Sequence, residues 1–329
     1  MRCSYRDAIG EIDSLDIVIE DREKNWISKW KPLKGDKIEI DYINKKLETL
    51  QDEDVVNKLG NYYLDTFQFQ GPPSTVNLKL LSVPLQSTIL DEKKVKVWEN
   101  ISLEQLAKNA AKDCNLKLEY YVDYKRVYTR LEQDESYYSL LKKTFEENGC
   151  VVKIYKDKLV IWEETKMEER KIVDTLFIDE CTSYIAENTD VDTYSECVIS
   201  YYDSRKNKNI EKKVRLSSRK GYRGDIKRTL LLHQDQQPPG ENAAQKSDYL
   251  KNIAKKALKK HNKEATTVTL ALMGRKHFFY AGECINITGF GVFDGKYLIK
   301  EVTVDLASYA VNLRMRATNT DDIDAEVVI

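Results

Sequence analysis

The sequence predicts an α+β protein that consists mainly of antiparallel β-sheet. Three observations lead to this fold class. Apolar and polar residues alternate over most of the first 98 residues and again over residues 266–317. The period changes to that of a helix near residue 101 and near residue 243. With 329 residues, the chain is also long enough for two or three domains, each with a core of its own.

The N-terminal region, residues 1–98, is predicted to be mostly β. In SLDIVIE, Leu15, Ile17 and Ile19 fall on one face, and KIEIDY repeats the pattern with Ile38 and Ile40. WKPLKGD supplies turn residues between these two runs. YLDTFQFQ and TVNLKLLSV follow as two further strands on either side of a GPP break. We therefore expect half-buried antiparallel strands in this region.

Residues 99–165 are predicted to form a small α+β unit. Ser102 and Gln105 make a capping box that marks the start of a helix. Two short alternating runs follow, LKLEYYV and RVYTRL, and then a second helix from about Asp134 to Gly149. VVKIYKDKLVIW is typical of a hairpin that turns at residues 156–158. This order of elements predicts a unit inserted between two β-rich regions.

Residues 166–318 are predicted to form the second β-rich region. EETKMEERK, at 163–171, is interpreted as a solvated connection because of its charge. ECVISYYD and NIEKKVRL are expected as strands joined by a basic turn, and residues 217–242 as a long surface loop. A helix is predicted from about Ala243 to His261, with one apolar stripe and one lysine face. TTVTLALMG, ECINITGFG, KYLIKEVTVDL and YAVNLRMRA are predicted strands, and the acidic segment 319–329 a tail or peripheral strand.

The charge is nearly balanced overall but unevenly distributed. The chain has 53 basic and 54 acidic residues, a formal net charge of −1. Residues 1–204 carry 29 positive and 40 negative side chains (−11), and residues 205–276 carry 20 and 6 (+14). Residues 277–329 carry 4 and 8 (−4). A single segment therefore holds the positive field.

Few residues point to catalysis, a metal or a cofactor. The six cysteines are far apart and form no CxxC pair, which favours reduced, mostly buried thiols. NTDVDTYSE, at 188–196, lacks the glycine and ligand order of a calcium loop. GFGVFDG, at 289–295, has the wrong glycine spacing for dinucleotide binding and is better explained by a hairpin turn. The acid pairs at 134–135 and 163–164 are interpreted as surface charges. We expect no catalytic residue, no metal and no cofactor.

The basic segment supplies the candidate contact residues. It has eleven lysine or arginine residues between positions 205 and 228, and the lysine face of the helix follows. Nucleic acid is the first partner that such charge suggests, but Tyr222 is the only aromatic residue there for base stacking. We favour an acidic neighbouring protein or subunit, with nucleic acid unlikely except as passing through a channel. The candidate subunit or partner contacts are Arg205, Lys206, Lys208, Lys212, Lys213, Arg215, Arg219, Lys220, Lys255 and Lys259.

The order of these features resembles the phage late control D family of baseplate hub proteins, from contractile phage tails and R-type, phage-tail-like bacteriocins. The likeness is greatest at residues 241–313, where a helix is followed by TTVTLALMGR, AGECINITGFG, FDGKYLIKEVTVDL and SYAVNLRM. The residues that match the family pattern there are Gly282, Gly289, Gly291, Gly295, Tyr297 and Val302. The histidine that often follows the penultimate strand of the family is absent, because Val304 and Asp305 occupy that region.

The N-terminal part is similar to the same family. DSLDIVIEDREKNWISKWKPLKGDKIEI looks like its opening pattern, and the matching residues are Asp21, Trp26, Pro32, Gly35 and Asp36. Residues 101–162 are similar to the inserted α+β domain of such hubs. The family usually has a further strand before the segment matched by residues 15–19, so the chain is expected to begin within its first domain. The resemblance extends over residues 10–318.

The resemblance implies a structural role. Such hubs contain two tube-protein-like β-barrel domains: here residues 1–98 (main part) and 166–318, with the inserted domain at 99–165, an acidic tail at 319–329, and the helix at 243–261 covering the second barrel. A homotrimer would adapt a six-fold tail tube to a three-fold central spike. The implied partners are the tail tube or tube-initiator protein, the spike and other baseplate proteins, in a virion component made in the cytoplasm. The alternatives are a tail-tip peptidoglycan hydrolase and a cell-wall or nucleic-acid binding module.

Overall fold

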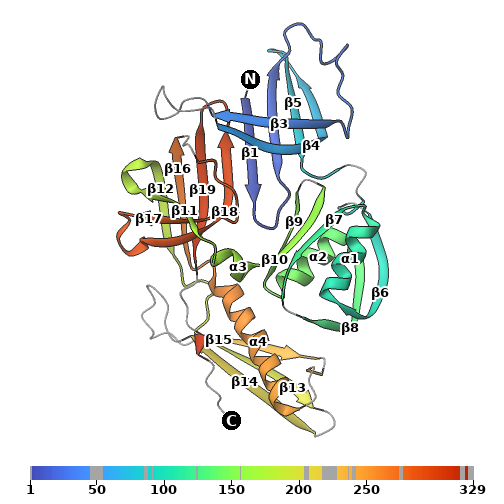
Figure 1. The fold of residues 1–329 in the computed structure, drawn as a ribbon, viewed down its shortest axis with the longest axis vertical. Helices are drawn as coiled ribbons and strands as arrows, with labels where there is room; N and C mark the ends of the chain where they lie inside the picture. Colours follow the sequence, from blue (N-terminus) through green and yellow to red (C-terminus); the bar gives the residue numbers. More distant parts are fainter. Residues whose placement is uncertain are drawn as a thin grey trace.

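A computed structural model gives the arrangement of the chain in space (Figure 1). It describes residues 2–44, 55–84, 88–90, 92–123, 125–155, 157–203, 207–216, 228–235, 237–238, 242–273, 277–318 and 323–324. The described part is mainly antiparallel β-sheet with a smaller helical content, so the predicted fold class is confirmed. None of its helices is both long and apolar enough to cross a membrane.

The N-terminal strands form one end of an eleven-stranded sheet. They are β1 (Arg2–Ala8), β2 (Ser14–Glu20), β3 (Lys37–Asn44), β4 (Val55–Gln70) and β5 (Thr75–Leu81), in the spatial order β1-β2-β5-β4-β3. All neighbours in this series are antiparallel, as the alternation predicts. Strand β1 precedes the segment at residues 15–19, so the strand that was expected to be missing is present.

The C-terminal strands continue the same sheet, because β1 also pairs with β18 (Figure 1). The strands of this second region are β11 (Ile172–Phe177), β12 (Cys181–Asn188), β16 (Thr266–Met273), β17 (Cys284–Thr288), β18 (Gly295–Asp305) and β19 (Ala310–Ala317). A 3-10 turn, η1 (Ile178–Glu180), joins β11 to β12, and η2 (Gly291–Phe293) joins β17 to β18. One apolar cluster extends through both regions and includes Tyr5, Leu15, Leu270 and Leu313. The two β regions are thus joined both by hydrogen bonds and by a shared core.

The inserted α+β unit has its own core. Its elements are β6 (Lys93–Ser102), α1 (Leu103–Asp113), β7 (Lys117–Tyr121), β8 (Val127–Ser136), α2 (Tyr137–Glu146), β9 (Cys150–Tyr155) and β10 (Lys158–Glu163). Ser102 caps α1 by accepting a hydrogen bond from the Gln105 amide, as predicted. The second helix begins at Tyr137 and not at Asp134, because residues 127–136 pair with β6. The expected boundary at 98/99 falls within β6.

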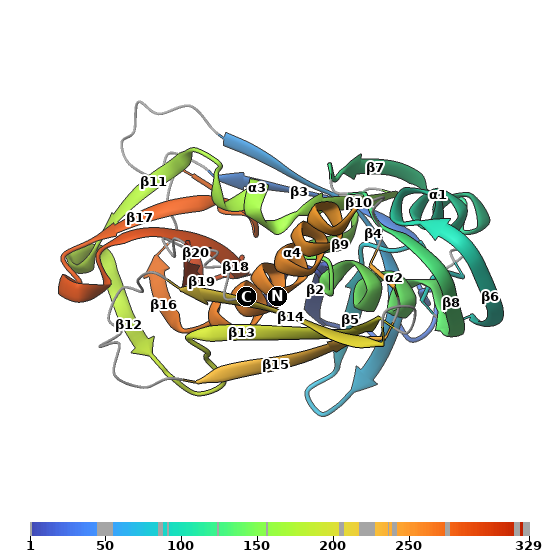
Figure 2. The same ribbon diagram turned by 90° about the horizontal axis from the view of Figure 1, so that it is seen from below.

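A fourth group of elements lies apart from the main sheet, at the lower end of the molecule in Figure 1; Figure 2 gives the view from below. It contains the described part of the basic segment. It consists of β13 (Glu196–Asp203), β14 (Lys208–Leu216), β15 (Thr229–Gln234), α4 (Ala243–Asn262) and β20 (Ile323–Asp324), with the sheet order β15-β13-β14-β20. The apolar stripe of α4 packs on β13 and β14, where Leu250, Ala254 and Leu258 meet Cys197 and Ile199. The expectation that this helix covers the second barrel is therefore wrong. The two strands supply the apolar face that it needs.

Two further expectations for this part of the chain are corrected. Residues 229–234 were assigned to a surface loop, yet they form β15, which pairs in parallel with β13 and buries Leu230. Residues 217–227 lie outside the described residues. The segment 163–171 contains a short helix, α3 (Glu164–Glu168), in which Met167 and Glu168 are buried. This segment is a packed part of the protein and not a solvated connection.

Candidate functional site

The candidate contact residues gather on the group formed by β13, β14 and α4. Lys208, Lys212, Lys213 and Arg215 lie on β14. The remaining described pair, Lys255 and Lys259, lies on α4, which packs on that strand. Arg205, Lys206, Arg219 and Lys220 lie outside the described residues. The fold therefore brings together on one small sheet and its helix all six of the candidates that it describes.

Some of these cations already have partners inside the chain. Lys213 Nζ lies 2.6 Å from Glu196 Oε1, and Arg215 Nε lies 3.2 Å from Glu196 Oε2. Thr229 also donates a hydrogen bond to Glu196. Burial acts to raise the pKa of Glu196, but these donors hold it below its usual range. Glu196 is thus bound to side chains of β14 and β15 within the same small sheet.

The cations that lack an ion-pair partner within the described part of the chain are Lys208, Lys212 and Lys255. Lys208 is exposed, and the other two are half-buried. Surface cations of this kind contribute little to folding, and they keep their charge for a partner. These three are the strongest of the original candidates for an intermolecular contact.

A buried ion-pair cluster joins α3 to the main sheet and to α4. Arg316 on β19 has a side chain that is 1% exposed, and its Nη2 lies 3.0 Å from Glu164 Oε1 and 2.6 Å from Glu168 Oε1. Lys259 Nζ lies 2.7 Å from Glu168, and Lys263 Nζ 3.0 Å from Glu164. Burial acts to raise the pKa of Glu164, but Lys263 and Arg316 hold it below its usual range. The cluster thus fixes α4 to the rest of the chain.

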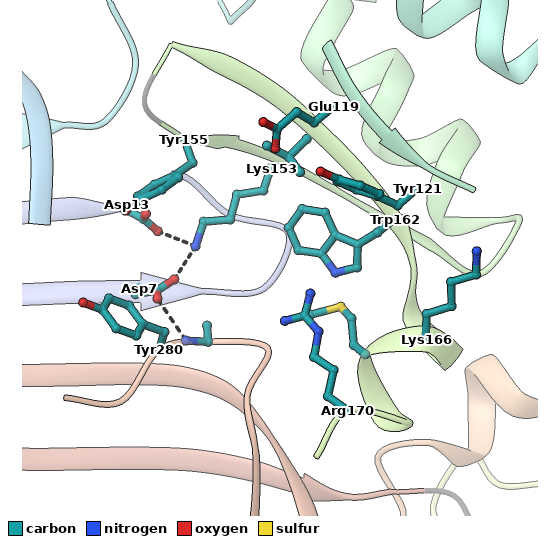
Figure 3. A pocket seen from close by; sticks show the side chains of 13 residues that line it. Asp7, Asp13, Glu119, Tyr121, Lys153, Tyr155, Trp162, Lys166, Arg170 and Tyr280 are labelled. Carbon is teal, nitrogen blue, oxygen red and sulfur yellow. Dashed lines mark hydrogen bonds and ion pairs between the residues drawn. The ribbon is translucent and has the colours of Figure 1, made fainter. Parts of the chain in front are cut away.

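A second buried cluster joins the inserted unit to the N-terminal strands (Figure 3). Lys153 on β9 contacts Asp7 on β1, and its Nζ lies 2.8 Å from Asp13 Oδ1, in the turn before β2. The other carboxylate oxygen of Asp7 accepts a hydrogen bond of 2.9 Å from the Ala281 amide. Burial raises the pKa of Asp13 to about 8, although Lys153 acts in the opposite direction. Three segments far apart in the sequence are held together here.

A cavity of about 630 Å³ lies beside this cluster. Its wall is the face of the sheet β7-β10-β9 that is turned away from α1 and α2, and Tyr121, Tyr155 and Trp162 point into it (Figure 3). Arg170 closes another side and donates a hydrogen bond to the Gly282 carbonyl. The buried indole N–H of Trp162 has no acceptor within the described residues. The cavity therefore combines aromatic surface with one unsatisfied donor.

The carboxylates beside the cavity are poorly placed for acid–base catalysis. Asp7 and Asp13 both contact Lys153, and their side chains are 4% and 1% exposed. Glu119, the third carboxylate that lines the cavity, is 34% exposed and lies 2.6 Å from Lys158 Nζ through its Oε1. A glycosidase needs two carboxyl groups that face the substrate. No cysteine, serine or histidine is among the residues that line the cavity. We therefore interpret Asp7, Asp13 and Lys153 as residues that position two parts of the fold.

Sequence reasoning did not identify either cluster. Lys153 interrupts the apolar run VVKIY, and Arg316 lies among the apolar residues of YAVNLRMRA. A cation inside a buried strand needs a partner, so each position predicts a nearby carboxylate. The partner could not be named, because Lys153 and Asp7 are 146 positions apart in the chain and Arg316 and Glu168 are 148.

Comparison with known proteins places this fold among phage tail proteins. No protein-family model matches the sequence, and no curated protein matches it. The chain is similar to the 43 kDa tail protein of prophage MuSo2 from Shewanella oneidensis, with a TM-score of 0.63 and 12% identity over 96% of this chain and 93% of that chain. The tail protein from Neisseria meningitidis MC58 gives 0.65 and 13% over 96% and 91%.

A third solved structure comes from a different kind of particle. The c3393 protein of E. coli, described as a component of the type VI secretion system with structural similarity to the T4 bacteriophage tail proteins gp27 and gp5, has a TM-score of 0.56 and 11% identity. The similarity covers 97% of this chain and 74% of that one. The expected resemblance to phage tail proteins is thus confirmed at the level of the fold.

Proposed function

We propose that the chain is a non-enzymatic structural hub of a contractile tail or tail-like injection particle. The observation that carries the proposal is the coverage of the fold similarity: 96% of this chain aligns with tail proteins that are themselves covered over more than nine-tenths. All units of the chain therefore take part, including the inserted α+β unit and the group around α4. A structural component of a particle acts through its shape and through its contacts with neighbouring subunits.

The two buried ion-pair clusters and the uneven charge distribution support a structural role for the chain. Lys153 and Arg316 are each bound by two carboxylates from other segments, which fixes the relative positions of the units. Three chains in a ring would offer a repeating acidic region and a repeating basic group around β14 and α4. Opposite charges on neighbouring subunits set orientation and register more than affinity. The proposed neighbours are other copies of the chain, the tail tube or its initiator, the spike and further baseplate proteins.

The oligomeric state of the purified protein tests this function. Light scattering coupled to gel filtration should give a mass about three times the chain mass of 38.2 kDa, and averaged electron micrographs should show three-fold symmetry. The same experiment with the triple variant Lys208→Glu, Lys212→Glu and Lys255→Glu should give a folded protein that assembles less well. A wild-type protein that stays monomeric at micromolar concentration, both alone and with purified tube and spike proteins, would contradict the proposal.

The alternative of a tail-tip peptidoglycan hydrolase is tested on the cavity. Its aromatic wall and the partly exposed carboxylate of Glu119 are the features that favour this alternative. Zymography of the full chain on peptidoglycan should give no lytic band. A band that disappears in Glu119→Gln would overturn the non-enzymatic assignment.

A further inference from the structure

The outer face of the small sheet β7-β10-β9 carries aromatic residues. Successive residues of a strand point to opposite faces, and Leu118, Leu159 and Ile154 point inward, because they belong to the core under α1 and α2. The registers of the sheet bring the alternate residues together on the other face, where Trp162 is directly opposite Tyr121. The residues of this face that line the cavity are Glu119, Tyr121, Lys153, Tyr155, Val160 and Trp162. Three of these six are aromatic, whereas the solvated face of a sheet is usually polar.

The rings on this face are accessible from the cavity (Figure 3). Tyr121 is 55% exposed, and Tyr155 and Trp162 are half-buried. Tyr280, from the segment before β17, adds a fourth ring, which is also half-buried. Aromatic residues that only complete a core are fully buried, as Phe145 is in the core under α1 and α2. The cavity therefore offers ring surface to a ligand that enters it.

Polar groups of both kinds lie around these rings. The carboxylate of Glu119 accepts a hydrogen bond from Lys158 and, because it is 34% exposed, can accept others from a ligand. The guanidinium of Arg170 donates to the Gly282 carbonyl, 3.0 Å away, and has further N–H groups. The indole N–H of Trp162 is a donor only, and Figure 3 shows Glu119 and Arg170 on opposite sides of that ring. A ligand that fits the cavity must therefore offer donors on one side and acceptors on the other.

The charges around the cavity are balanced. Among the residues that the structure describes, its lining includes three carboxylates and three cations: Asp7, Asp13 and Glu119, and Lys153, Lys166 and Arg170. A phosphate chain or another polyanion would meet three carboxylates here, without a net positive field to attract it. A fully apolar ligand would displace water from Glu119 and Arg170 without replacing its hydrogen bonds. An uncharged ligand that is rich in hydroxyl groups avoids both penalties.

We propose that the cavity binds a short uncharged saccharide that carries acetamido groups. The C–H groups on one face of a pyranose ring pack on the rings of Tyr121 and Trp162, whose faces carry partial negative charge. Sugar hydroxyl groups donate to Glu119, and an acetamido carbonyl accepts from Trp162 and Arg170. The cavity volume of about 630 Å³ is within the range of small-molecule sites, roughly 300 to 1,000 Å³. The site goes beyond the proposed hub function and does not depend on it, because one chain supplies all of these groups.

Two tyrosines of similar exposure give a matched test of the ring contact. Isothermal titration calorimetry of the full chain with tri-N-acetylchitotriose should give saturable binding at a single site. Tyr121→Ala should raise the dissociation constant by about tenfold or more, because it removes ring surface from the cavity. Tyr202→Ala on β13, where the ring is 50% exposed but lies outside the cavity, should change it by less than about twofold. No binding by the wild type, or equal effects of the two substitutions, would overturn the proposal.

A second pair of measurements tests the acetamido contact. Trp162→Phe keeps an aromatic ring but removes the N–H, so the binding of tri-N-acetylchitotriose should weaken by about fivefold. The wild-type chain should bind maltotriose, which has no acetamido group, more weakly than tri-N-acetylchitotriose by a similar factor. Equal binding of the two sugars, or tighter binding of a short oligothymidylate than of either, would contradict the assignment. These titrations measure sugar binding and not subunit association, so their failure is distinct from a failure of the hub function.

Discussion

Arg316 on β19 and Glu168 on α3 lie 2.6 Å apart, between Nη2 and Oε1, where the two side chains are 1% and 7% exposed. A pair that is so well shielded from water interacts strongly, but each charge has lost its hydration. Glu164 shares the same guanidinium at 3.0 Å, so the cation is balanced by two carboxylates. The end of the inserted unit is thus attached to the last strand of the main sheet by charge as well as by packing.

Removal of the guanidinium should destabilise the protein strongly. Arg316→Met keeps much of the side-chain volume but leaves Glu164 and Glu168 with fewer partners in a buried place. We expect the free energy of unfolding to fall by about 3 kcal/mol. Arg314→Met, two positions earlier on the same strand but exposed, should change it by less than about 0.5 kcal/mol. Urea denaturation of both variants measures the difference, and equal losses would refute the role of the cluster.

The buried carboxyl of Asp13 should make stability depend on pH. Burial raises its pKa in the folded chain to about 8 from the ordinary value of 3.8. Between these values the folded state binds a proton that the unfolded state has released. Stability therefore decreases as the pH rises towards 8, by up to about 1.4 kcal/mol per pH unit from this group. The decrease should level off above that pH.

Asp13→Asn removes this titration and should flatten the profile. Denaturation midpoints of the wild type and the variant are measured from about pH 5 to pH 8. They should be most similar near pH 5, where Asp13 is protonated in the folded state, and should diverge as the pH rises towards 8. The exposed Asp16 on β2 supplies the control, since Asp16→Asn should leave the slope as it is in the wild type. Parallel profiles for the wild type and Asp13→Asn would show that Asp13 is not the group responsible.

Much of the fold could be predicted because its signals are local. The alternation in KYLIKEVTVDL and YAVNLRMRA gave β18 and β19, and the Ser102 cap gave the start of α1. Strand β12 escaped prediction because most of its side chains, including Tyr184 and Ile185, are exposed. With no buried face it shows no alternation. Its position is set by pairing with β16, which is a tertiary contact.

The location of the basic segment in the fold depended on long-range contacts as well. The apolar stripe of α4 was predicted correctly, but a stripe does not identify the surface that it covers. Lys259 was predicted to point outward as a contact residue, and in the structure it is bound to Glu168. The prediction for Lys259 failed because its partner lies on α3, whose sequence of charged residues is typical of an exposed connection. Its carboxylates are buried beside the cations of β19 and of the C-terminal end of α4.

The glycines of GFGVFDG should differ in their tolerance of a side chain. Gly289 has a φ of +92°, and a Cβ there would lie 2.9 Å from Ile178 Cγ2. Gly291 also has a positive φ, of +65°, but a Cβ there would meet nothing within 4 Å. Both alanine variants suffer backbone strain, and Gly289→Ala suffers a steric clash in addition. Gly289→Ala should be the less stable variant by about 1 to 3 kcal/mol, measured by chemical denaturation. The reverse order would contradict the packing of β17 against η1.

Lys255 and Lys259 lie one helical turn apart on α4, and the same substitution should have different effects at the two positions. Lys259→Glu places a carboxylate beside Glu168 in a buried cluster, so the free energy of unfolding should fall by about 2 kcal/mol or more. Lys255→Glu should change it by less than about 0.5 kcal/mol, because no ion pair is lost among the described residues. Its effect should appear in assembly, as a weaker association that depends less on salt concentration. Light scattering over a range of salt concentrations measures this. If the Lys255→Glu protein assembles like the wild type, Lys255 does not belong to the proposed contact surface. If Lys259→Glu loses stability but assembles like the wild type, the role of Lys259 is limited to its ion pair with Glu168.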